Sequence, residues 1–391
     1  MPCTIKLGSL CLPTVSRTIA QMKLRHTILV ATLLLLPIGT SASAQSNAQL
    51  TQILVSAKEG TRAPAMGAII FRNGKIVASA VTGVRRTDRS DHVRLGDSWI
   101  IGSTGKPQTV AMIARLVDRG VLAWDAPLST MLPALADQMR PEYRSVTLIQ
   151  LLSHHAGLPE NISDTAYIQS FFADKRPLNE QRLSYVTRAL SEAPAYAPGS
   201  DFGYSNTGFL IAAVIAEKAT GKTYEALMRR EIFGPHGMSS AGFGATPPGQ
   251  PTGHDAGKPV GPSNSDMIAP AGNLHMSLRD WARFCLDQLA GSKGKGRLLA
   301  PGSYRLMQAA QPNGPTGLDW GIQSSIAGRQ GPVLVHGGSD GYWFAFVVLF
   351  PGSGNGALVI DNASEKMGGD VAAKAALAAI LPSLAPAVIA R

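Results

Sequence analysis

The sequence predicts an α+β protein in which both chain ends build one antiparallel sheet, flanked by helices, and a mostly helical region is inserted between them. Strand-like runs, rich in β-branched and aromatic residues and bounded by Gly, Pro or Asn, occur near both ends. They lie at 66–72, 75–83, 332–336, 342–349 and 357–361. The middle of the chain, about 121–290, instead alternates helical stretches with Pro- and Gly-rich loops. We expect a functional site at the seam between sheet and helices.

The chain has 391 residues, of which 45% are hydrophobic and 16% charged. This composition supports a large core and excludes a disordered protein. The formal net charge of +10 suggests a nucleic-acid partner, but the first 44 residues contain four bases and no acid. The remaining 32 bases and 26 acids give only +6, so we expect no nucleic-acid partner.

The first 44 residues have the pattern of an upstream extension followed by a secretory signal peptide. Met22-Lys23-Leu24-Arg25 forms a basic start, 28–38 is apolar, and Ala42-Ser43-Ala44 is a small-residue cleavage site. The apolar run is about half of the ~20 residues that a membrane-spanning helix needs, so we expect no transmembrane anchor. The expected product is one soluble domain, 45–391, that is periplasmic or secreted after cleavage near Ala44.

Individual elements follow from local patterns. Asn73-Gly74 between two apolar runs is a strong hairpin signal, because both turn positions favour positive φ. Apolar residues recur at helical spacing after Ser103, and Pro107 is tolerated because it lies in the first turn. Helices are expected at 49–59, 103–118, 146–152, 208–219 and 370–381.

Ser103-Thr104-Gly105-Lys106 is the first candidate for chemistry. At helical spacing, residues i and i+3 share a face, so the hydroxyl and the ammonium are neighbours. A partly desolvated lysine near a helix N-terminus has a lowered pKa and can accept the proton of the hydroxyl. The spacing alone favours a serine N-cap followed by a surface lysine, because S-x-x-K is short and common.

Two further motifs are candidates. Tyr204-Ser205-Asn206 precedes an apolar helix and offers a phenol that can act as a base and an amide that can orient a substrate, or simply an asparagine N-cap. His336-Gly337-Gly338-Ser339 follows a strand. Its glycines allow a ligand to approach the backbone, whose free N–H groups can hold an oxyanion, whereas the histidine alone fits a structural role.

Other active-site patterns are excluded or unsupported. Residues 337–341 match G-x-S-x-G, but no histidine follows His336, so Ser339 lacks the downstream base of an α/β-hydrolase. The pair His154-His155 lacks ligand spacing, and we interpret it as loop packing. No zinc, phosphate-loop or dinucleotide motif occurs, and the sequence implies no metal or organic cofactor.

The three motifs in this order resemble the serine β-lactamase-related, penicillin-binding-protein-like family. The nearest branch contains class C β-lactamases, D-alanyl-D-alanine carboxypeptidases and family VIII esterases. Further similarity lies in 99–106 (WIIGSTGK), 120–128 (GVLAWDAPL), 146–159 (VTLIQLLSHHAGLP) and 269–274 (APAGNL). The resemblance implies a β-lactamase/transpeptidase-like fold and covers most of the chain after 44.

The resemblance also implies roles. Ser103 is the acylated nucleophile, Lys106 its proton partner and Tyr204 a base, although either Lys106 or Tyr204 can be the principal base. Asn206 orients Lys106 and the substrate amide, and the N–H groups of Ser103 and Ser339 form the oxyanion hole. Asn161 corresponds more loosely to a substrate-binding glutamine.

His336-Gly337-Gly338 stands where β-lactamases have Lys-Thr-Gly. A histidine with the ordinary pKa of about 6.5 is mostly neutral at pH 7, so the permanent charge of that lysine is lost. The expected function is an exported serine hydrolase, with an esterase or D-alanyl-D-alanine carboxypeptidase favoured over a β-lactamase. Its substrate is a small molecule or peptide, for example one derived from peptidoglycan. The alternative is a non-catalytic protein that binds peptidoglycan or D-peptides.

Overall fold

The structure is a computed structural model that describes residues 42–385. The predicted leader therefore lies outside the described residues, except for 42–44, which begin helix α1 (Ala42–Lys58). All further statements concern the described part of the chain.

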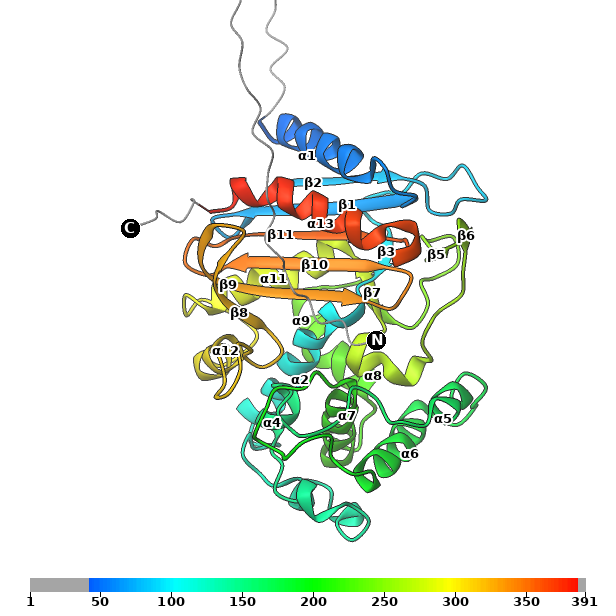
Figure 1. The fold of residues 1–391 in the computed structure, drawn as a ribbon. Coiled ribbons are helices and arrows are strands. Elements are labelled where there is room, and N and C mark those ends of the chain that lie inside the picture. The colour runs from blue at the N-terminus through cyan, green and yellow to red at the C-terminus, as the bar shows by residue number, and fades with distance from the viewer. Residues whose placement is uncertain (1–41, 386–391) are drawn as a thin grey trace, which may run out of the picture. The chain divides into compact units, whose positions relative to one another are not determined.

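Six strands form one antiparallel sheet in the order β2-β1-β11-β10-β9-β8 (Figure 1). The strands are β1 (Ala65–Arg72), β2 (Lys75–Gly83), β8 (Gly321–Ile326), β9 (Arg329–Ser339), β10 (Phe344–Phe350) and β11 (Asn355–Asp361). Strand β1 pairs with β2 on one side and with β11 on the other, so both chain ends share one sheet. This confirms the predicted fold class.

The turn between β1 and β2 has the predicted geometry, with φ of 51° at Asn73 and 70° at Gly74. Strand β9 is longer than expected and continues to Ser339, so the third motif lies inside a strand rather than after it. Strand β10 begins at Phe344, two residues later than expected, because 339–343 form the connection from β9.

The two faces of the sheet belong to different hydrophobic cores, as the period-2 alternation of strand side chains requires. On β1, Met66, Ala68 and Ile70 pack towards α1 and α13 (Gly369–Ile380), which lie together against the sheet in Figure 1. Ile69 and Phe71 face the larger core, which includes the helical region. The candidate site lies on this second side.

Each of the five predicted helices has a counterpart, although α1 begins seven residues before the predicted start at 49. Besides α1 and α13 the helices are α2 (Lys106–Asp118), α3 (Leu128–Met131), α4 (Leu148–Leu152), α5 (Thr165–Ser170), α6 (Leu178–Ser191), α7 (Asn206–Thr220), α8 (Tyr224–Met228), α9 (Gly234–His236), α10 (Ala269–Gly272), α11 (Leu278–Gly291) and α12 (Pro301–Gln308). Helix α4 starts two residues later than predicted, because Thr147 caps it and forms a capping box with Gln150. Ser103 precedes α2, in a short 3₁₀ turn over Gly102–Gly105.

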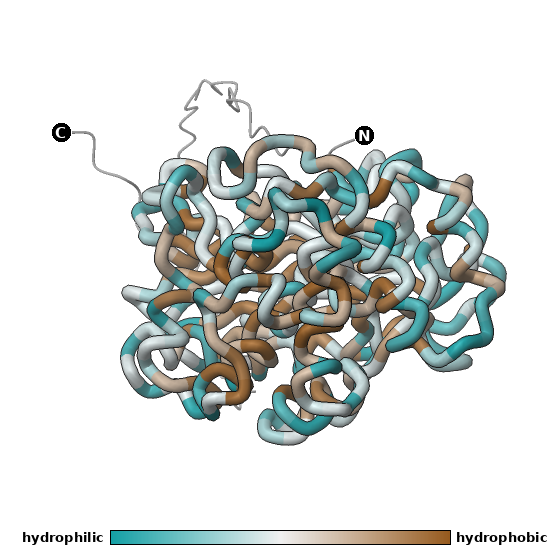
Figure 2. Tube along the Cα trace, turned by 90° about the horizontal axis from the view of Figure 1, so that it is seen from below, coloured by the Kyte–Doolittle hydropathy of each residue, from teal (hydrophilic) through white to brown (hydrophobic). Residues whose placement is uncertain are grey.

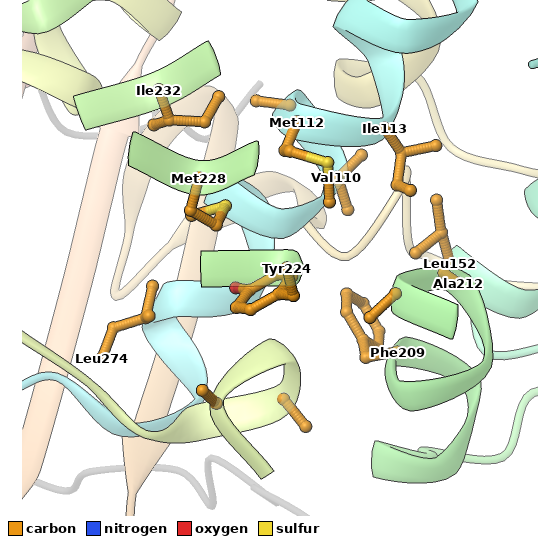
Figure 3. Packing of buried hydrophobic residues seen from close by; sticks show 14 of the residues in the cluster. Val110, Met112, Ile113, Leu152, Phe209, Ala212, Tyr224, Met228, Ile232 and Leu274 are labelled. Atoms are coloured by element: carbon orange, nitrogen blue, oxygen red, sulfur yellow. The ribbon is translucent and has the colours of Figure 1, made fainter. Parts of the chain in front are cut away.

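Short strands connect the helical region to the sheet. Strands β3 (Ser98–Ile100), β7 (Leu274–Ser277) and β4 (Gly242–Phe243) form a small sheet, and β5 (His254–Asp255) pairs with β6 (Lys258–Pro259). Viewed from below, hydrophobic segments gather inside the tube trace and hydrophilic ones around it (Figure 2). In the core, Val110 and Ile113 of α2 lie on the side of Phe209 and Ala212 of α7, whereas Met112 lies towards Met228 and Ile232 (Figure 3). Helix α2, which follows Ser103, is thereby buried on several sides.

Candidate active site

The turn that carries Ser103 packs directly on the end of β9. A Cβ atom at Gly102, where φ is +54°, would lie 2.7 Å from the backbone N of Ser339. A Cβ atom at Gly338 would lie 2.8 Å from the backbone N of Ser103. Both approaches are too close for any side chain, so glycine is required on each side. The first and third motifs are therefore in direct backbone contact.

Lys106 is completely buried and stands at the start of α2, one helical turn after Ser103. Its Nζ donates hydrogen bonds to Ser103 Oγ at 2.9 Å, to the Tyr204 hydroxyl at 2.6 Å and to the backbone O of Ala271. The Tyr204 hydroxyl in turn donates to Ser103 Oγ at 2.7 Å. The three side chains predicted to be catalytic thus form a closed triangle.

The environment of Lys106 favours its neutral form. Burial lowers the pKa of Lys106 to about 8, although the charges of Asp319 and Glu160 oppose the shift. The cation–π contacts of the ammonium, 4.8 Å from the centre of the Tyr204 ring and 5.5 Å from that of Phe209, also act against the shift, so burial is the cause of the lowered pKa. A lysine with this pKa can accept and return a proton near neutral pH.

The start of α7 positions the second motif. The N-cap is Ser205, whose Oγ accepts a hydrogen bond from Gly208 N at 3.2 Å and donates to Pro159 O at 2.7 Å. Asn206 is therefore not the N-cap. Its Nδ2 donates to Asn161 Oδ1 at 3.3 Å, whereas the hydrogen bonds of Lys106 go to other groups. The expected contact between Asn206 and Lys106 is thus replaced by one between Asn206 and Asn161.

The third motif reaches the site along β9. The hydroxyl of Ser339 accepts a hydrogen bond from Gly341 N at 2.9 Å, within a turn that leads towards β10. This local role agrees with the rejection of Ser339 as a nucleophile. Gly338 brings the strand against the turn that carries Ser103, and His336 Nε2 lies 2.8 Å from Asp319 Oδ2.

Two residues at the site escaped the sequence analysis. Asp319 is buried in the connection between α12 and β8, and its Oδ1 accepts a hydrogen bond from His154 Nε2 at 3.0 Å. The His154 ring stacks at 4.7 Å from the Tyr204 ring, so the interpretation of His154 as loop packing was incomplete. Its place in a segment similar to a family loop was a signal for His154, while nothing in the sequence singled out Asp319.

Within 42–385, no group of three or more His, Cys, Asp or Glu side chains is placed to hold a metal ion. None of the helices in the same range combines the length and the apolar character needed to cross a membrane.

Several curated proteins with similar sequences are named as hydrolases or as penicillin-binding proteins. Esterase EstB of Burkholderia gladioli is 32% identical over 189 residues, which is 46% of this chain and 47% of EstB. The D-alanyl-D-alanine-carboxypeptidase/endopeptidase AmpH of Escherichia coli K12 is 27% identical over 273 residues, 66% of this chain and 69% of AmpH. The match to EstB therefore spans about half the length of that relative.

Solved structures share the fold at lower identity. The octameric penicillin-binding protein homologue from Pyrococcus abyssi has a TM-score of 0.71 and 21% identity, covering 87% of this chain and 78% of that one. SurE with D-Leu has a TM-score of 0.69 and 22% identity, covering 89% and 78%.

The profile of the Beta-lactamase family matches residues 50–381. This range includes both sheet halves and every side chain of the triangle. Together with relatives named as an esterase and a carboxypeptidase, it indicates chemistry of the serine hydrolase type. The chain belongs to the Beta-lactamase family.

Proposed function

We propose that the protein is a serine hydrolase that forms an acyl-enzyme on Ser103. The observation that carries this proposal is the triangle in which Ser103 Oγ lies 2.9 Å from Lys106 Nζ and 2.7 Å from the Tyr204 hydroxyl. A hydroxyl is a weak nucleophile until a neighbouring base removes its proton. Both neighbours of Ser103 are groups that can exchange that proton.

In the acylation step, Ser103 Oγ attacks the carbonyl carbon of an ester or amide, and its proton passes to Lys106 or Tyr204. The carbonyl oxygen becomes an oxyanion, held by the backbone N–H groups of Ser103 and Ser339, each worth about 10²–10³-fold in rate. The bond to the leaving group then breaks, and the leaving group takes the proton. Water repeats the sequence on the acyl-enzyme, releases the acid and restores Ser103.

The substrate we propose is a short-chain ester or a D-alanyl peptide, in preference to a β-lactam. The names of EstB and AmpH support the first two classes, and the D-Leu in the SurE structure agrees with a D-amino-acid substrate. His336 in place of the family lysine weakens the case for a β-lactamase. Asn206 and Asn161 contact each other near Tyr204 and are the amides that we assign to substrate binding.

A non-catalytic protein that binds peptidoglycan or D-peptides is the alternative. Such a protein has no need of a nucleophile held by two proton-transfer groups. Burying the Lys106 ammonium disfavours folding, and a binding function alone gives no reason to retain it. These observations favour the enzyme.

The test is intact-mass spectrometry of the protein after brief incubation with benzylpenicillin, with the drug assayed in the same tube. A lasting adduct that is absent in Ser103→Ala identifies a penicillin-binding peptidase. Intact drug without an adduct directs the assay to p-nitrophenyl esters and D-alanyl peptides, and hydrolysed drug identifies a β-lactamase. Ser339→Ala is the matched control and retains most activity, because only its N–H is used.

If Ser103→Ala turned over every substrate as fast as the unchanged protein, the acyl-enzyme proposal would be wrong. If neither protein acted on any of these classes, while the unchanged protein bound D-peptides, the binding alternative would replace it.

We also propose that the protein is exported, with residues 1–44 removed and 45–391 retained as one domain that includes the helical subregion of about 121–290. The signal-like pattern supports this proposal. Mass spectrometry of the protein from the periplasmic and culture fractions tests it. An N-terminus near Gln45 is expected, and a full-length chain confined to the cytoplasm would contradict it.

A further inference from the structure

His154 has a backbone conformation that is unusual for a histidine. Its φ is +66°, in the left-handed region that L-residues rarely adopt, and its side chain is buried. Glycine is the usual residue at such an angle. A histidine persists there only where the surrounding contacts hold it, and such positions occur often at functional sites. Three of these contacts involve residues 203–205, the segment that carries Tyr204.

His154 contacts this segment through its backbone and through its side chain. The backbone N–H of Gly203 donates to the backbone O of His154 at 2.9 Å, and that of Ser205 donates to His154 Nδ1 at 3.1 Å. The imidazole ring itself lies against the Tyr204 ring, with 4.7 Å between the ring centres and 34° between the planes. One residue therefore holds both sequence neighbours of Tyr204 as well as its ring.

Both nitrogens of the His154 ring are engaged in hydrogen bonds with the protein. Because Nδ1 accepts from the Ser205 N–H, the ring proton is on Nε2, which donates to Asp319 Oδ1 at 3.0 Å. Burial lowers the pKa of His154, even though the hydrogen bond and charge of Asp319 oppose the shift, in agreement with a neutral ring. His154 thus has no free lone pair to accept a substrate proton.

Asp319 fixes the other edge of the His154 ring. Its side chain is fully buried, and its backbone φ is +68°, so two residues with left-handed backbones meet in this hydrogen bond. Because Nε2 is held by Asp319 and Nδ1 by the Ser205 N–H, the ring cannot turn without breaking one of these bonds. The face of the imidazole therefore stays against Tyr204.

The hydroxyl of Tyr204 depends on the placement of its ring. It donates to Ser103 Oγ at 2.7 Å and accepts from Lys106 Nζ at 2.6 Å. Hydrogen bonds of this length tolerate little displacement of the phenol. A misplacement of about 1 Å can reduce a reaction rate about 100-fold. The contacts of His154 therefore bear on the proton transfer, although His154 does not exchange the proton.

We propose that His154 is a positioning residue that, held by Asp319, keeps the Tyr204 hydroxyl within hydrogen-bond distance of Ser103 and Lys106. This role rests on the proposed function, in which Tyr204 exchanges a proton with Ser103. It also replaces the sequence-based interpretation of His154 as loop packing.

The first test measures the order of the Tyr204 ring and requires no activity. In NMR spectra of the protein labelled with ¹³C-tyrosine, Tyr204→Phe identifies the Tyr204 signals by their loss. The unchanged protein should give one sharp set of these signals, and His154→Gly should give broadened or multiple sets. One sharp set in His154→Gly would overturn the proposal. This result does not depend on whether Ser103 is acylated, so it stands even if the acyl-enzyme proposal fails.

The second test is kinetic. His154→Gly removes the side chain without straining the backbone, because glycine readily adopts a φ of +66°. We expect kcat for p-nitrophenyl acetate to fall about 100-fold, with a smaller change in KM. His154→Asn should recover part of this loss, because its side chain keeps an acceptor near the position of Nδ1 and tolerates the left-handed backbone. Unchanged kcat in His154→Gly contradicts the proposal.

A double-mutant cycle separates positioning from general damage to the fold. Tyr204→Phe removes the hydroxyl that His154 is proposed to place. Adding His154→Gly to Tyr204→Phe should therefore lower kcat by no more than about threefold, although His154→Gly alone has a large effect. Two losses that simply multiply would mean that His154 acts independently of the Tyr204 hydroxyl, and the proposal would be wrong.

His155→Gly is the matched control, because it removes the same atoms from the next residue. His155 is also buried, but its Nδ1 lies 3.1 Å from Ser153 Oγ and its ring contacts Phe202. This variant should lose stability while kcat and the Tyr204 signals stay unchanged. A loss of kcat as large as in His154→Gly would indicate general destabilisation and overturn the proposal. Should His154→Gly fail to fold, the same cycle with His154→Asn, expected to lower kcat about 10-fold, decides.

Discussion

Burial of Lys106 lowers the stability of the fold but gives the side chain the pKa that the proposed catalysis needs. Its ammonium is removed from water, and the three hydrogen bonds from Nζ end on uncharged oxygen atoms. Burial therefore disfavours the charged form and lowers the pKa to about 8. The same shift makes proton transfer possible near neutral pH. A lysine that was solvated or ion-paired would keep its ordinary pKa, and it would stabilise the fold better but catalyse less well.

Lys106→Met should abolish turnover and change how stability depends on pH. The pKa of Lys106 is about 8 in the folded state, against 10.5 for an ordinary lysine. Below pH 8, burying the charged Lys106 therefore lowers the free energy of unfolding by about 3 kcal/mol. This cost disappears as pH rises from 8 to 10.5. We expect the stability of the unchanged protein relative to Lys106→Met to rise across that range in urea unfolding. A pH-independent difference would contradict the assignment.

Gly338→Ala tests the backbone contact between the first and third motifs. The added methyl group would lie 2.7 Å from Ile101 O and 2.8 Å from Ser103 N, so the end of β9 must move away. Displacing the oxyanion donor should reduce the acylation rate by about 10²-fold or more while the fold persists. Gly352→Ala, where nothing lies within 4 Å, is the control and should acylate normally. Equal rates in both variants would argue against the assigned oxyanion hole.

At the scale of elements, helix caps hold the catalytic side chains in place. Ser205 caps α7 and also bonds to Pro159 O, so it ties the residue after Tyr204 to a neighbouring loop. Ser205→Ala should lower the free energy of unfolding by about 1 kcal/mol and also lower kcat, because Tyr204 loses its anchor. Thr223→Ala removes the equivalent cap of α8 and should cost similar stability with normal kcat. Activity loss in both variants would mean that the cap at Ser205 has no special role.

The elements also show which parts of the site were predictable. The contact between Ser103 and Lys106 follows from spacing within one turn, and the hairpin at Asn73-Gly74 follows from local turn chemistry. Asp319 was not predictable, because it comes from an irregular connection and meets His154, 165 residues away, only through tertiary folding. The extension of β9 to Ser339 was likewise missed. Glycines weaken the strand signal in the sequence, but pairing with β10 keeps this segment in the sheet.

At the scale of the whole domain, the sheet separates two hydrophobic cores, of which only one supports the candidate site. The sequence indicated one sheet from both chain ends, but the strand order β2-β1-β11-β10-β9-β8 depends on pairings between distant segments that no local pattern specifies. One core, with α1 and α13, covers the face away from the site. The other includes α2, α7 and β7, and it supports the triangle directly.

This division predicts different outcomes for two equally buried leucines. Leu54 lies in α1 and Leu274 in β7, and both are completely buried. Either substitution by alanine should lower the free energy of unfolding by about 2–5 kcal/mol. Only Leu274→Ala should also lower kcat, because the Leu274 side chain packs against Gly105 and its backbone O accepts from Ile101 N at 3.0 Å. Thermal unfolding and kcat at a temperature where both variants remain folded make the comparison. A loss of kcat in Leu54→Ala as large as that in Leu274→Ala would show that the two cores act as one.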